Sequence, residues 1–426
     1  MVAPRVLITG TGAVCGSGMH PADILQAMRD GRSSIGPIGQ WDTTGWPVKV
    51  AAEIRDFNPR ALVEDRKLHK LIRRTDMLGL YAAAQAIDNA GFIAHRDTLD
   101  ADAAATFSDR SGIYVGSGGG AYNSQYEFFP LMTQAHDDPG AFGRELGSTV
   151  NPMWLLRTLP NNVLCHVGIK YNLKGSNACI TNHSAGGTLS VIEAAEALRQ
   201  GEADRTVAIG HDATIEPQMV LYYHRCGLLA QDAIRPFDAA RGGSLFGEGA
   251  GALALETERS AAERGAPVLG EVLGGGYASE ATGLLAIRDD GNGVKRAITG
   301  ALGDAGLAPV DIGMIVAHGN GTRGSDASEA AAIGEVFGTG TAAPPVTAFK
   351  WAIGHLIAAA GIAEAVIALE ALRERVVPGV ATLDRLDPQC AGLRISREAQ
   401  VPRSDVALII CRGFAGTNAA LIIRSR

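Results

Sequence analysis

Ser184 is the first residue whose surroundings indicate chemistry. It opens the small-residue run Ser184-Ala-Gly-Gly, placed where an apolar strand is expected to turn sharply into a helix. A side chain at such a turn meets the partial positive charge of the helix N-terminus. That charge can convert a cysteine into a thiolate, whereas a serine hydroxyl stays un-ionised and needs a dedicated base to accept an acyl group. Acyl transfer to Ser184 is therefore expected to be poor or absent.

A serine hydrolase is one alternative for this elbow. The segment Asn182-His-Ser-Ala-Gly186 lacks the first glycine of the G-x-S-x-G motif, which counts against it. His183 adjoins Ser184, but neighbours that enter from a strand point to opposite sides, so a local Ser–His pair is not expected. Four histidines are interpreted as structural residues: His166, His183, His211 and His224.

Four further segments, in order along the chain, carry a family resemblance. Residues 235–251 read RPFDAARGGSLFGEGAG, and residues 317–322 read AHGNGT, followed by Asp326 and Glu329. Residues 350–364 read KWAIGHLIAAAGIAE, and residues 413–418 read GFAGTN. They resemble the RPFDxxRDGFVxGEGAG, AHGTxT, KxxxGHxxxAAGxxE and GFGGTN segments of the beta-ketoacyl-ACP synthases (ketosynthases) of the thiolase superfamily, in particular the elongating, ketoacyl-ACP synthase II-like kind.

Spacing within this resemblance selects Ser184 as the nucleophile position. In the family, the nucleophile follows nine residues after the glycine of a Gly-Pro-Ser segment, and its helix closes at a glycine seventeen residues later. Counting nine from Gly175 reaches Ser184, and seventeen more reach Gly201. Cys179 lies in an Ala-Cys dipeptide like that of the family, but choosing it would require shifts of five residues on each side. Cys179 is therefore interpreted as a small buried strand residue.

The resemblance also implies roles for the second half of the site. His318 and His355 match the two histidines that polarise the malonyl thioester carbonyl and stabilise the enolate left when carbon dioxide departs. Donors aimed at a developing oxyanion are worth on the order of 3 kcal/mol each in comparable sites. Lys350 and Glu364 match the residues that hold the histidine segment in place.

Substrate gating and carrier binding follow from the same resemblance. Phe414 matches the gatekeeper of the acyl pocket, and its N–H and that of Ser184 match the oxyanion hole. Asn320 and Thr322 lie where the pantetheine arm of an acyl carrier protein binds. Three departures from the family pattern put the details of gating in question: Asn320 for threonine, Gly242 for aspartate and Ala415 for glycine.

The elements that must position these residues read as an α/β fold. Strand-like runs at 6–9, 206–209 and 314–317 alternate with helical segments such as 77–90 and 188–199. Apolar strands alternating with helices indicate sheets covered on both faces. The resemblance makes this a thiolase-like fold with a duplicated, layered α-β-α-β-α architecture.

Two halves are expected within that fold. The polar stretch 256–267 separates residues 1–258, which carry the elbow, from residues 259–426, which carry both histidines. A weak internal similarity, called here the echo, supports the division. An apolar strand runs into a small-residue turn at 178–187 and again at 408–418.

Composition excludes several classes of protein. Lys plus Arg gives 38 against 45 for Asp plus Glu, a net charge of −7 that does not suggest nucleic-acid binding. Six cysteines without a C-x-x-C pair predict no disulfides, no metal site and a reducing cytoplasm. No signal peptide is visible, and the apolar stretch 356–372 contains two glutamates, so it reads as a buried helix rather than a membrane span. No permanently bound cofactor is expected, only the phosphopantetheine of the carrier protein.

Two partners are expected. The resemblance implies a homodimer that pairs across the edge strand at 176–181 and buries the segment 161–167, although a heterodimer with another ketosynthase is also open. An acidic acyl carrier protein needs a local basic surface on this chain. The candidate surface, with a solvated helix face as its ordinary alternative, is the run Arg66, Lys67, Lys70, Arg73 and Arg74.

These observations favour a malonyl-ACP decarboxylase of the kind found in polyketide β-branching cassettes, which supplies acetyl-ACP. The histidines are present and the thiol is lost, as that activity requires. Three alternatives stay open: a non-catalytic chain-length-factor-like subunit, a condensing enzyme that uses serine, and a protein whose natural cysteine was exchanged for Ser184.

Overall fold

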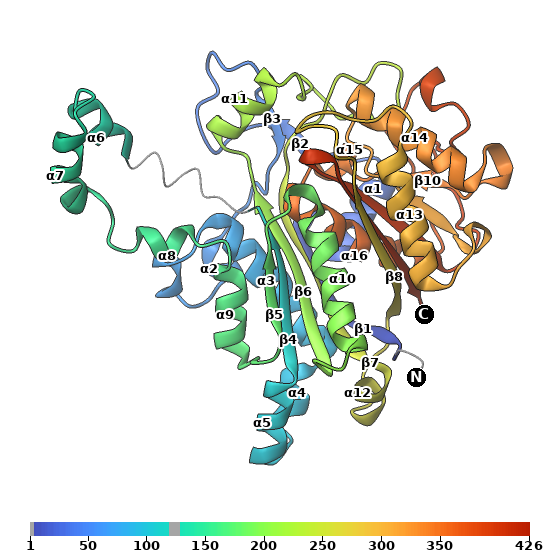
Figure 1. Ribbon diagram of the computed structural model, residues 1–426, viewed down its shortest axis with the longest axis horizontal. Coiled ribbons are helices and arrows are strands. Elements are labelled where there is room, and N and C mark those ends of the chain that lie inside the picture. Colours follow the sequence, from blue (N-terminus) through green and yellow to red (C-terminus); the bar gives the residue numbers. More distant parts are fainter. Residues whose placement is uncertain (1–3, 119–127) are drawn as a thin grey trace.

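A mixed β-sheet runs through the molecule (Figure 1). The computed structural model describes residues 4–118 and 128–426 of the chain. Within them the strands are β1 (Val6–Cys15), β2 (Ile35–Pro37), β3 (Val50–Ala52), β4 (Ser111–Ser117), β5 (Asn177–Ile180), β6 (Arg205–Ala213), β7 (Glu248–Thr257), β8 (Gly270–Ser279), β9 (Met314–Val316), β10 (Val346–Thr347), β11 (Val406–Arg412) and β12 (Thr417–Ser425). Ten of these form one sheet in the order β10-β9-β11-β12-β8-β1-β7-β6-β4-β5, and β2 pairs with β3.

The ten strands divide into two sets with the same internal arrangement. The spatial order is β5-β4-β6-β7-β1 in the first set and β10-β9-β11-β12-β8 in the second. In both spatial orders the second strand is parallel to its two neighbours, the first and third strands, and the fourth is antiparallel to its two neighbours, the third and fifth. One topology is therefore repeated, and the sets meet where β1 pairs with β8.

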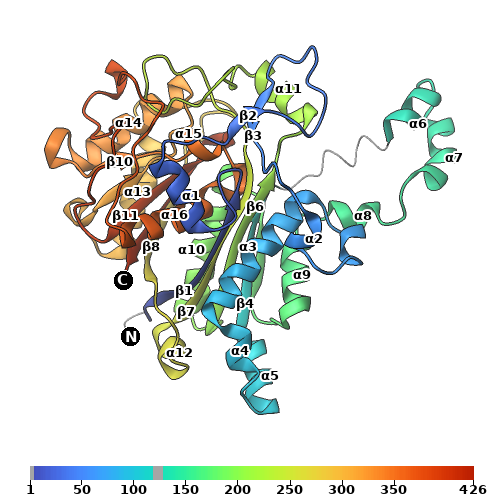
Figure 2. The same ribbon diagram turned by 180° about the vertical axis from the view of Figure 1, so that it is seen from behind.

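Helices form three layers around the two sets of strands. They are α1 (Pro21–Arg29), α2 (Pro59–Leu62), α3 (Arg74–Ala90), α4 (Phe92–Arg96), α5 (Ala101–Asp109), α6 (Phe129–Gln134), α7 (Pro139–Thr149), α8 (Trp154–Thr158), α9 (Asn162–Tyr171), α10 (Gly186–Arg199), α11 (Pro217–Arg225), α12 (Glu258–Glu263), α13 (Asn292–Ala305), α14 (Arg323–Phe337), α15 (Lys350–Ile353) and α16 (Ala360–Arg373). Helices α10 and α16 lie between the two sets of strands and share one apolar core with them. Helix α3 covers the outer face of the first set (Figure 2), and α13 and α14 cover that of the second. The predicted layered α/β, thiolase-like fold is confirmed.

The repeat differs from the echo read in the sequence. That echo matched 178–187 with 408–418, but the counterpart of β5 in the second set is β10, not β11. The segment after β5 leads through Ser184 into α10, and the segment after β10 leads through His355 into α16. The echo was misleading because strands that run into small-residue turns occur at several places in such a fold. Ser184 and His355 therefore lie in equivalent connections of the two repeats.

Most expected elements are present. The runs at 6–9, 206–209 and 314–317 lie in or at the ends of β1, β6 and β9, and the helical segments lie in α3 and α10. In α16 every residue except Glu370 and Arg373 is buried, as predicted for the stretch 356–372. Across the described residues no helix has both the length and the hydropathy that a bilayer crossing needs. The boundary expected at 258 falls at the first residue of α12, between the two sets of strands, and as a domain boundary it stays a prediction.

We predict that Gly361→Ala destabilises the fold, because the added methyl group would push helices α10 and α16 apart. A Cβ at Gly361 in α16 would lie 1.9 Å from Oγ1 of Thr188 in α10. Overpacking of this kind typically costs about 1–3 kcal/mol, so the thermal unfolding midpoint should fall. Adding Thr188→Ala should recover most of the loss, since it removes the clashing atom.

Gly303→Ala is the matched control. Gly303 also lies inside a helix, α13, but a Cβ there meets nothing within 4 Å. Alanine favours helix over glycine by up to about 1 kcal/mol, so this variant should be neutral or slightly stabilised. Equal midpoints for the Gly361 variant and the wild type would contradict close packing of α10 on α16.

Candidate active site

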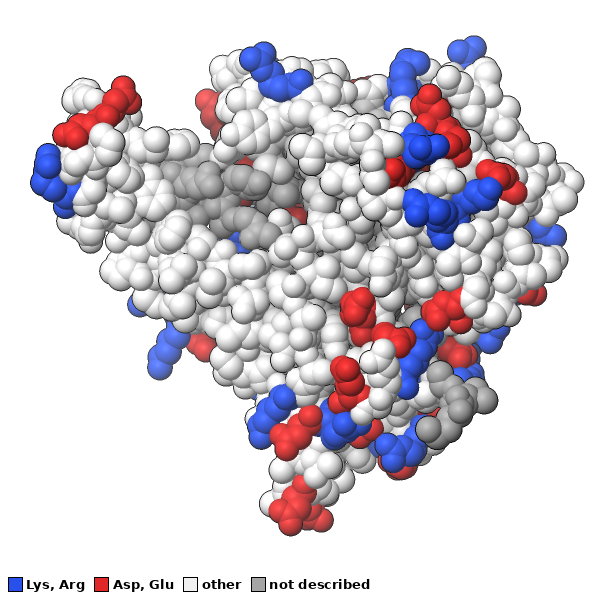
Figure 3. Space-filling model, in the orientation of Figure 1, with Lys and Arg blue, Asp and Glu red and all other residues white. Residues whose placement is uncertain are grey.

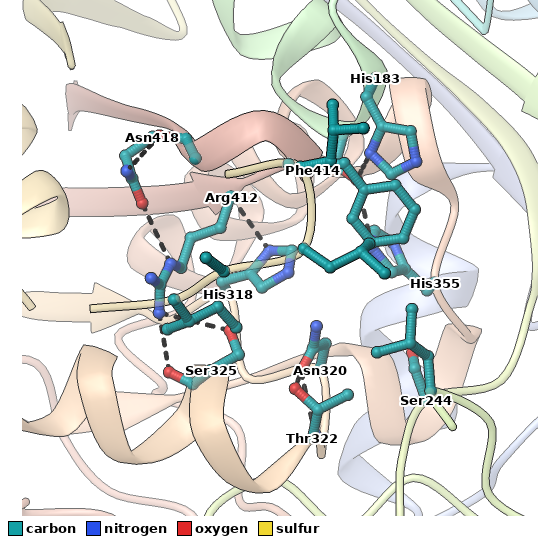
Figure 4. A pocket seen from close by; sticks show the side chains of 18 of the residues that line it. His183, Ser244, His318, Asn320, Thr322, Ser325, His355, Arg412, Phe414 and Asn418 are labelled. Carbon is teal, nitrogen blue, oxygen red and sulfur yellow. Dashed lines mark hydrogen bonds between the residues drawn. The ribbon is translucent and has the colours of Figure 1, made fainter. Parts of the chain in front are cut away.

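One pocket gathers most of the predicted site residues (Figure 4). They come from four separate segments of the chain, each of which follows a strand of the sheet: β5, β9, β10 or β11. Lys350 is the exception, because it lies behind the pocket, fully buried, rather than on its wall. The predicted residues that line the pocket are Ser184, His318, Asn320, Thr322, His355 and Phe414.

Ser184 lies at the elbow that the sequence predicts. It occupies a 3₁₀ turn, His183–Ala185, that leads directly into α10, and its side chain is fully buried. The turn approaches β4 so closely that a Cβ on Gly116 would lie 2.3 Å from the backbone of Gly186. Small residues are therefore required here, as the run after Ser184 suggests.

The position of the His183 side chain contradicts the sequence-based interpretation that it points away from Ser184. Its Nδ1 lies 2.9 Å from Ser184 Oγ, so the two residues form the local pair that was not expected. The alternation argument fails because β5 ends at Ile180, and His183 has a φ of 46°, in the left-handed region. Asn182 and the small residues after Ser184 were the available signals that the extended strand ends before this pair.

His318 and His355 face each other across the pocket. Their ring centroids are 5.2 Å apart and the rings are nearly perpendicular. Nδ1 of His318 accepts a hydrogen bond from the Arg412 N–H at 3.3 Å, and Nδ1 of His355 accepts one from the Ile357 N–H at 3.2 Å. Each neutral ring must therefore carry its proton on Nε2. The site offers two imidazole N–H donors.

Burial keeps both imidazoles neutral. Desolvation, reinforced by the positive charge of Lys350, lowers the pKa of His318 and of His355 well below the ordinary value. Lys350 Nζ donates to Glu364 Oε1 at 2.6 Å, and neither side chain is exposed. Burial raises the pKa of Glu364 to about 7, and Lys350 opposes that rise.

Backbone contacts hold the His318 loop. The carboxylate of Glu329 accepts hydrogen bonds from the N–H groups of His318 and Gly319, at 2.7 and 3.0 Å. Asp326 accepts one from Gly321 at 3.1 Å. Both carboxylates lie in α14, so the segment after β9 is fixed by the helix that follows it.

Two further predicted features lie beside Ser184. The Phe414 ring stacks on His183 with centroids 4.5 Å apart. Neither the Ser184 N–H nor the Phe414 N–H donates a hydrogen bond to another described residue.

At the pocket wall, Oδ1 of Asn320 accepts from both the N–H and the hydroxyl of Thr322, at 3.0 and 2.9 Å.

Arg412 is a pocket residue that the sequence analysis missed. Its guanidinium is buried and donates to Glu280, Asn418 and the Ser325 carbonyl, at 2.8, 3.0 and 2.8 Å (Figure 4). The arginine precedes the GFAGTN segment directly, but nothing in the residue order shows that Glu280, 132 positions away, is its partner.

Cys179 lies in β5, as predicted, but it is half-buried rather than buried. Its thiol donates to the Pro160 carbonyl at 3.5 Å, and desolvation raises its pKa, so it is no thiolate. It does not line the pocket. Among the described residues, no cluster of His, Cys, Asp and Glu is arranged to hold a metal ion.

Comparisons with known proteins identify the family. Residues 3–261 match the family model "Beta-ketoacyl synthase, N-terminal domain", and residues 269–384 match "Beta-ketoacyl synthase, C-terminal domain". The chain is 30% identical to a 3-oxoacyl-[acyl-carrier-protein] synthase 2 of Coxiella burnetii, over 98% of both chains. A solved structure described as "The ishigamide ketosynthase/chain length factor" shares 30% identity and a TM-score of 0.86 over the full length of both chains. A beta-ketoacyl synthase from Burkholderia phymatum shares 25% identity and a TM-score of 0.87, over 99% of this chain and all of the other. The chain belongs to the beta-ketoacyl synthase family.

Proposed function

We propose that this ketosynthase-family protein decarboxylates a malonyl group carried as a thioester on an acyl carrier protein. The reaction consumes a proton and converts the malonyl thioester into an acetyl thioester and carbon dioxide. The observation that carries the proposal is the pair of neutral imidazoles, His318 and His355, whose Nε2–H groups belong to one pocket.

Loss of carbon dioxide leaves an enolate whose oxygen carries negative charge. Two preorganised N–H donors in a buried site stabilise such an oxygen, each by on the order of 3 kcal/mol. Because both rings are neutral, they act as donors without first taking up a proton. The Lys350–Glu364 pair supports this state, since the lysine charge disfavours imidazolium.

Ser184 separates decarboxylation from chain elongation. Elongation in this family depends on a cysteine thiolate that holds the acyl chain, and the helix terminus at α10 would stabilise such a thiolate. The same terminus leaves a serine hydroxyl un-ionised. The enolate then takes a proton instead of attacking an enzyme-bound thioester.

The carrier would present its substrate on a phosphopantetheine arm. Asn320 and Thr322 line the pocket and are proposed to contact that arm. Leu284 and Leu285 also line the pocket and are 77% and 51% exposed, so they lie at its solvent side.

A dimer is proposed as the working assembly. Strand β5 is the last strand of the sheet order, so one of its edges has no partner strand within the described residues. Ile169 of α9 is 73% exposed in a groove that Asn177 of β5 also lines. Figure 3 shows few charged side chains over the middle of this face, where α9 and β5 lie.

A chain-length-factor-like subunit is the second candidate. It is favoured by the likeness to the ishigamide ketosynthase/chain length factor, which extends over the whole chain. A subunit that only shapes a partner's pocket has less reason to keep the paired histidines and their backbone contacts, so this candidate ranks second.

The first prediction concerns turnover of a malonyl carrier protein. His318→Ala or His355→Ala should lower the rate of acetyl-carrier formation by about 10²-fold or more, because each removes an oxyanion donor. Ser184→Ala should have a smaller effect, and Ser184→Cys should gain acyl loading at the helix terminus. Mass spectrometry of the carrier measures acetyl-carrier formation for all four variants, and mass spectrometry of the intact protein measures its acyl loading.

His224→Ala serves as the control for that experiment. His224 lies in α11, outside the pocket, so its loss should leave turnover near the wild-type rate. A folded wild-type protein that leaves malonyl carrier intact would exclude the decarboxylase.

The second prediction concerns carrier docking, and the structure corrects the basic surface. Arg73 and Arg74 are partly buried and form ion pairs with Asp76 and Glu248. Their charges are therefore used within the fold and are not free to attract a carrier. The exposed members are Arg66, Lys67 and Lys70.

Lys67→Glu or Lys70→Glu should each weaken carrier binding several-fold at low salt, because an acidic carrier loses an attractive charge. The difference should disappear at high salt, where the Debye length is short. Arg259→Glu is the matched charge-reversal control. Its side chain, in α12, is 70% exposed, and the substitution should leave carrier binding unchanged. Equal carrier affinity for all three variants at low salt would exclude this surface as the carrier-docking site.

The third prediction concerns assembly. Ile169→Lys should shift a sedimenting dimer toward monomer, because it places a charge in the proposed contact. Val310→Lys, at a 72% exposed valine in the second half of the chain, should leave the dimer intact. A species that dimerises only with a second ketosynthase would favour the chain-length-factor candidate.

A further inference from the structure

Ser184 Oγ lies between two imidazoles. It is 2.9 Å from His183 Nδ1 and 3.3 Å from His355 Nε2. His355 has its proton on Nε2, because Nδ1 accepts the Ile357 N–H, so His355 is the donor to Ser184 Oγ. The single hydroxyl hydrogen of Ser184 is then left for His183 Nδ1.

His183 is held in the form of a base. With Nδ1 accepting from Ser184, its own proton lies on Nε2, which is 2.5 Å from the Tyr223 hydroxyl. Burial lowers the pKa of His183 to about 4, so the ring is neutral at pH 7. Stacking on Phe414 and the Tyr223 contact fix the ring plane toward the serine.

The surroundings of Ser184 suit a tetrahedral oxyanion. The N–H groups of Ser184 and Phe414 donate to no other described residue, and Gly413 lies beside both His183 and Ser184. A Cβ at Gly413 would lie 3.5 Å from the Ser184 nitrogen, an ordinary contact distance, so this small residue adjoins the Ser184 N–H without crowding it. Ser184 also precedes α10, whose N-terminal partial charge favours an anion.

We propose that Ser184 is an acyl acceptor with His183 as its general base, so that the protein forms a serine ester from acyl thioesters that carry no carboxylate. Ser184 Oγ attacks the thioester carbonyl carbon and its proton passes to His183 Nδ1. The tetrahedral intermediate collapses with cleavage of the C–S bond, and His183 returns the proton to the departing sulfur. The acyl group moves from sulfur to oxygen, and a free thiol is released.

This activity goes beyond the proposed decarboxylation and does not depend on it. Decarboxylation uses the Nε2–H donors of His318 and His355 and needs a malonyl substrate. Acylation uses the hydroxyl of Ser184 and the lone pair of His183, and a simple acetyl thioester suffices. It also revises the expectation that acyl transfer to Ser184 is poor or absent, because the required base is present.

The test uses the full chain and the acetyl thioester of N-acetylcysteamine. Peptide mass spectrometry should find one acetyl group on Ser184 that survives neutral hydroxylamine, which removes a thioester formed on Cys179. Ser184→Ala should carry none at that position. His183→Phe, which keeps an aromatic ring on Phe414, and His183→Ala should acylate at least about 10²-fold more slowly.

His224→Ala is the matched control, since this histidine lies next to Tyr223 in α11 but outside the pocket, and it should acylate at the wild-type rate. Thermal unfolding identifies which His183 variants are folded. No acetyl group on Ser184 of the folded wild type, or a folded His183 variant that acylates at the wild-type rate, would overturn the proposal. Carbon dioxide release from malonyl carrier is measured in parallel, so failure of the decarboxylase and failure of the acyl acceptor are distinguished.

Discussion

The close approach of α10 and α16 is the constraint on which the site depends. A Cβ on Gly187 would lie 2.5 Å from the Ala358 carbonyl, so the helix starts are almost in backbone contact. Packing at this density leaves no room for adjustment. Ser184 and His355 lie in the turns that lead into these helices, and the approach brings Ser184 Oγ to 3.3 Å from His355 Nε2. Duplication of one topology supplies both turns, and small residues allow them to meet.

The site also depends on a buried ion pair, Lys350–Glu364. Removing Lys350 and Glu364 from water costs free energy that their 2.6 Å contact only partly repays. The pair nevertheless has a chemical consequence, because the lysine charge helps to keep His318 and His355 neutral. A neutral imidazole with Nδ1 bound to a backbone N–H presents one defined donor. The ion pair and the backbone contacts together decide which atom of each ring faces the substrate.

The pocket combines two kinds of chemistry that are usually considered apart. In the proposed decarboxylation His318 and His355 offer N–H groups to a developing oxyanion, whereas in the proposed acylation His183 offers a lone pair to the Ser184 hydroxyl. A thiolate needs only the helix terminus, but a serine needs a base. By the spacing argument, His183-Ser184 stands where the family has Ala-Cys, so the residue that could serve as base accompanies the hydroxyl. Ser184 Oγ contacts both His183 and His355, so one atom connects the two proposed activities.

The sequence by itself determined the layered α/β fold, and its resemblance to the ketosynthases implied the elbow at Ser184 and the membership of His318 and His355 in one site. The fold depends on local patterns of apolar strands and helices, whereas the site assignments depend on motifs whose order and spacing match a known family. Only the tertiary structure decided the partner of each side chain. The left-handed φ of His183 turned its ring toward Ser184, although strand alternation predicts the opposite. The equivalence of β5 with β10, the pairing of Arg412 with Glu280 and the internal pairing of Arg73 and Arg74 likewise depend on contacts between segments distant in the chain. Such contacts are set by how whole elements pack, and the order of residues within one element does not contain that information.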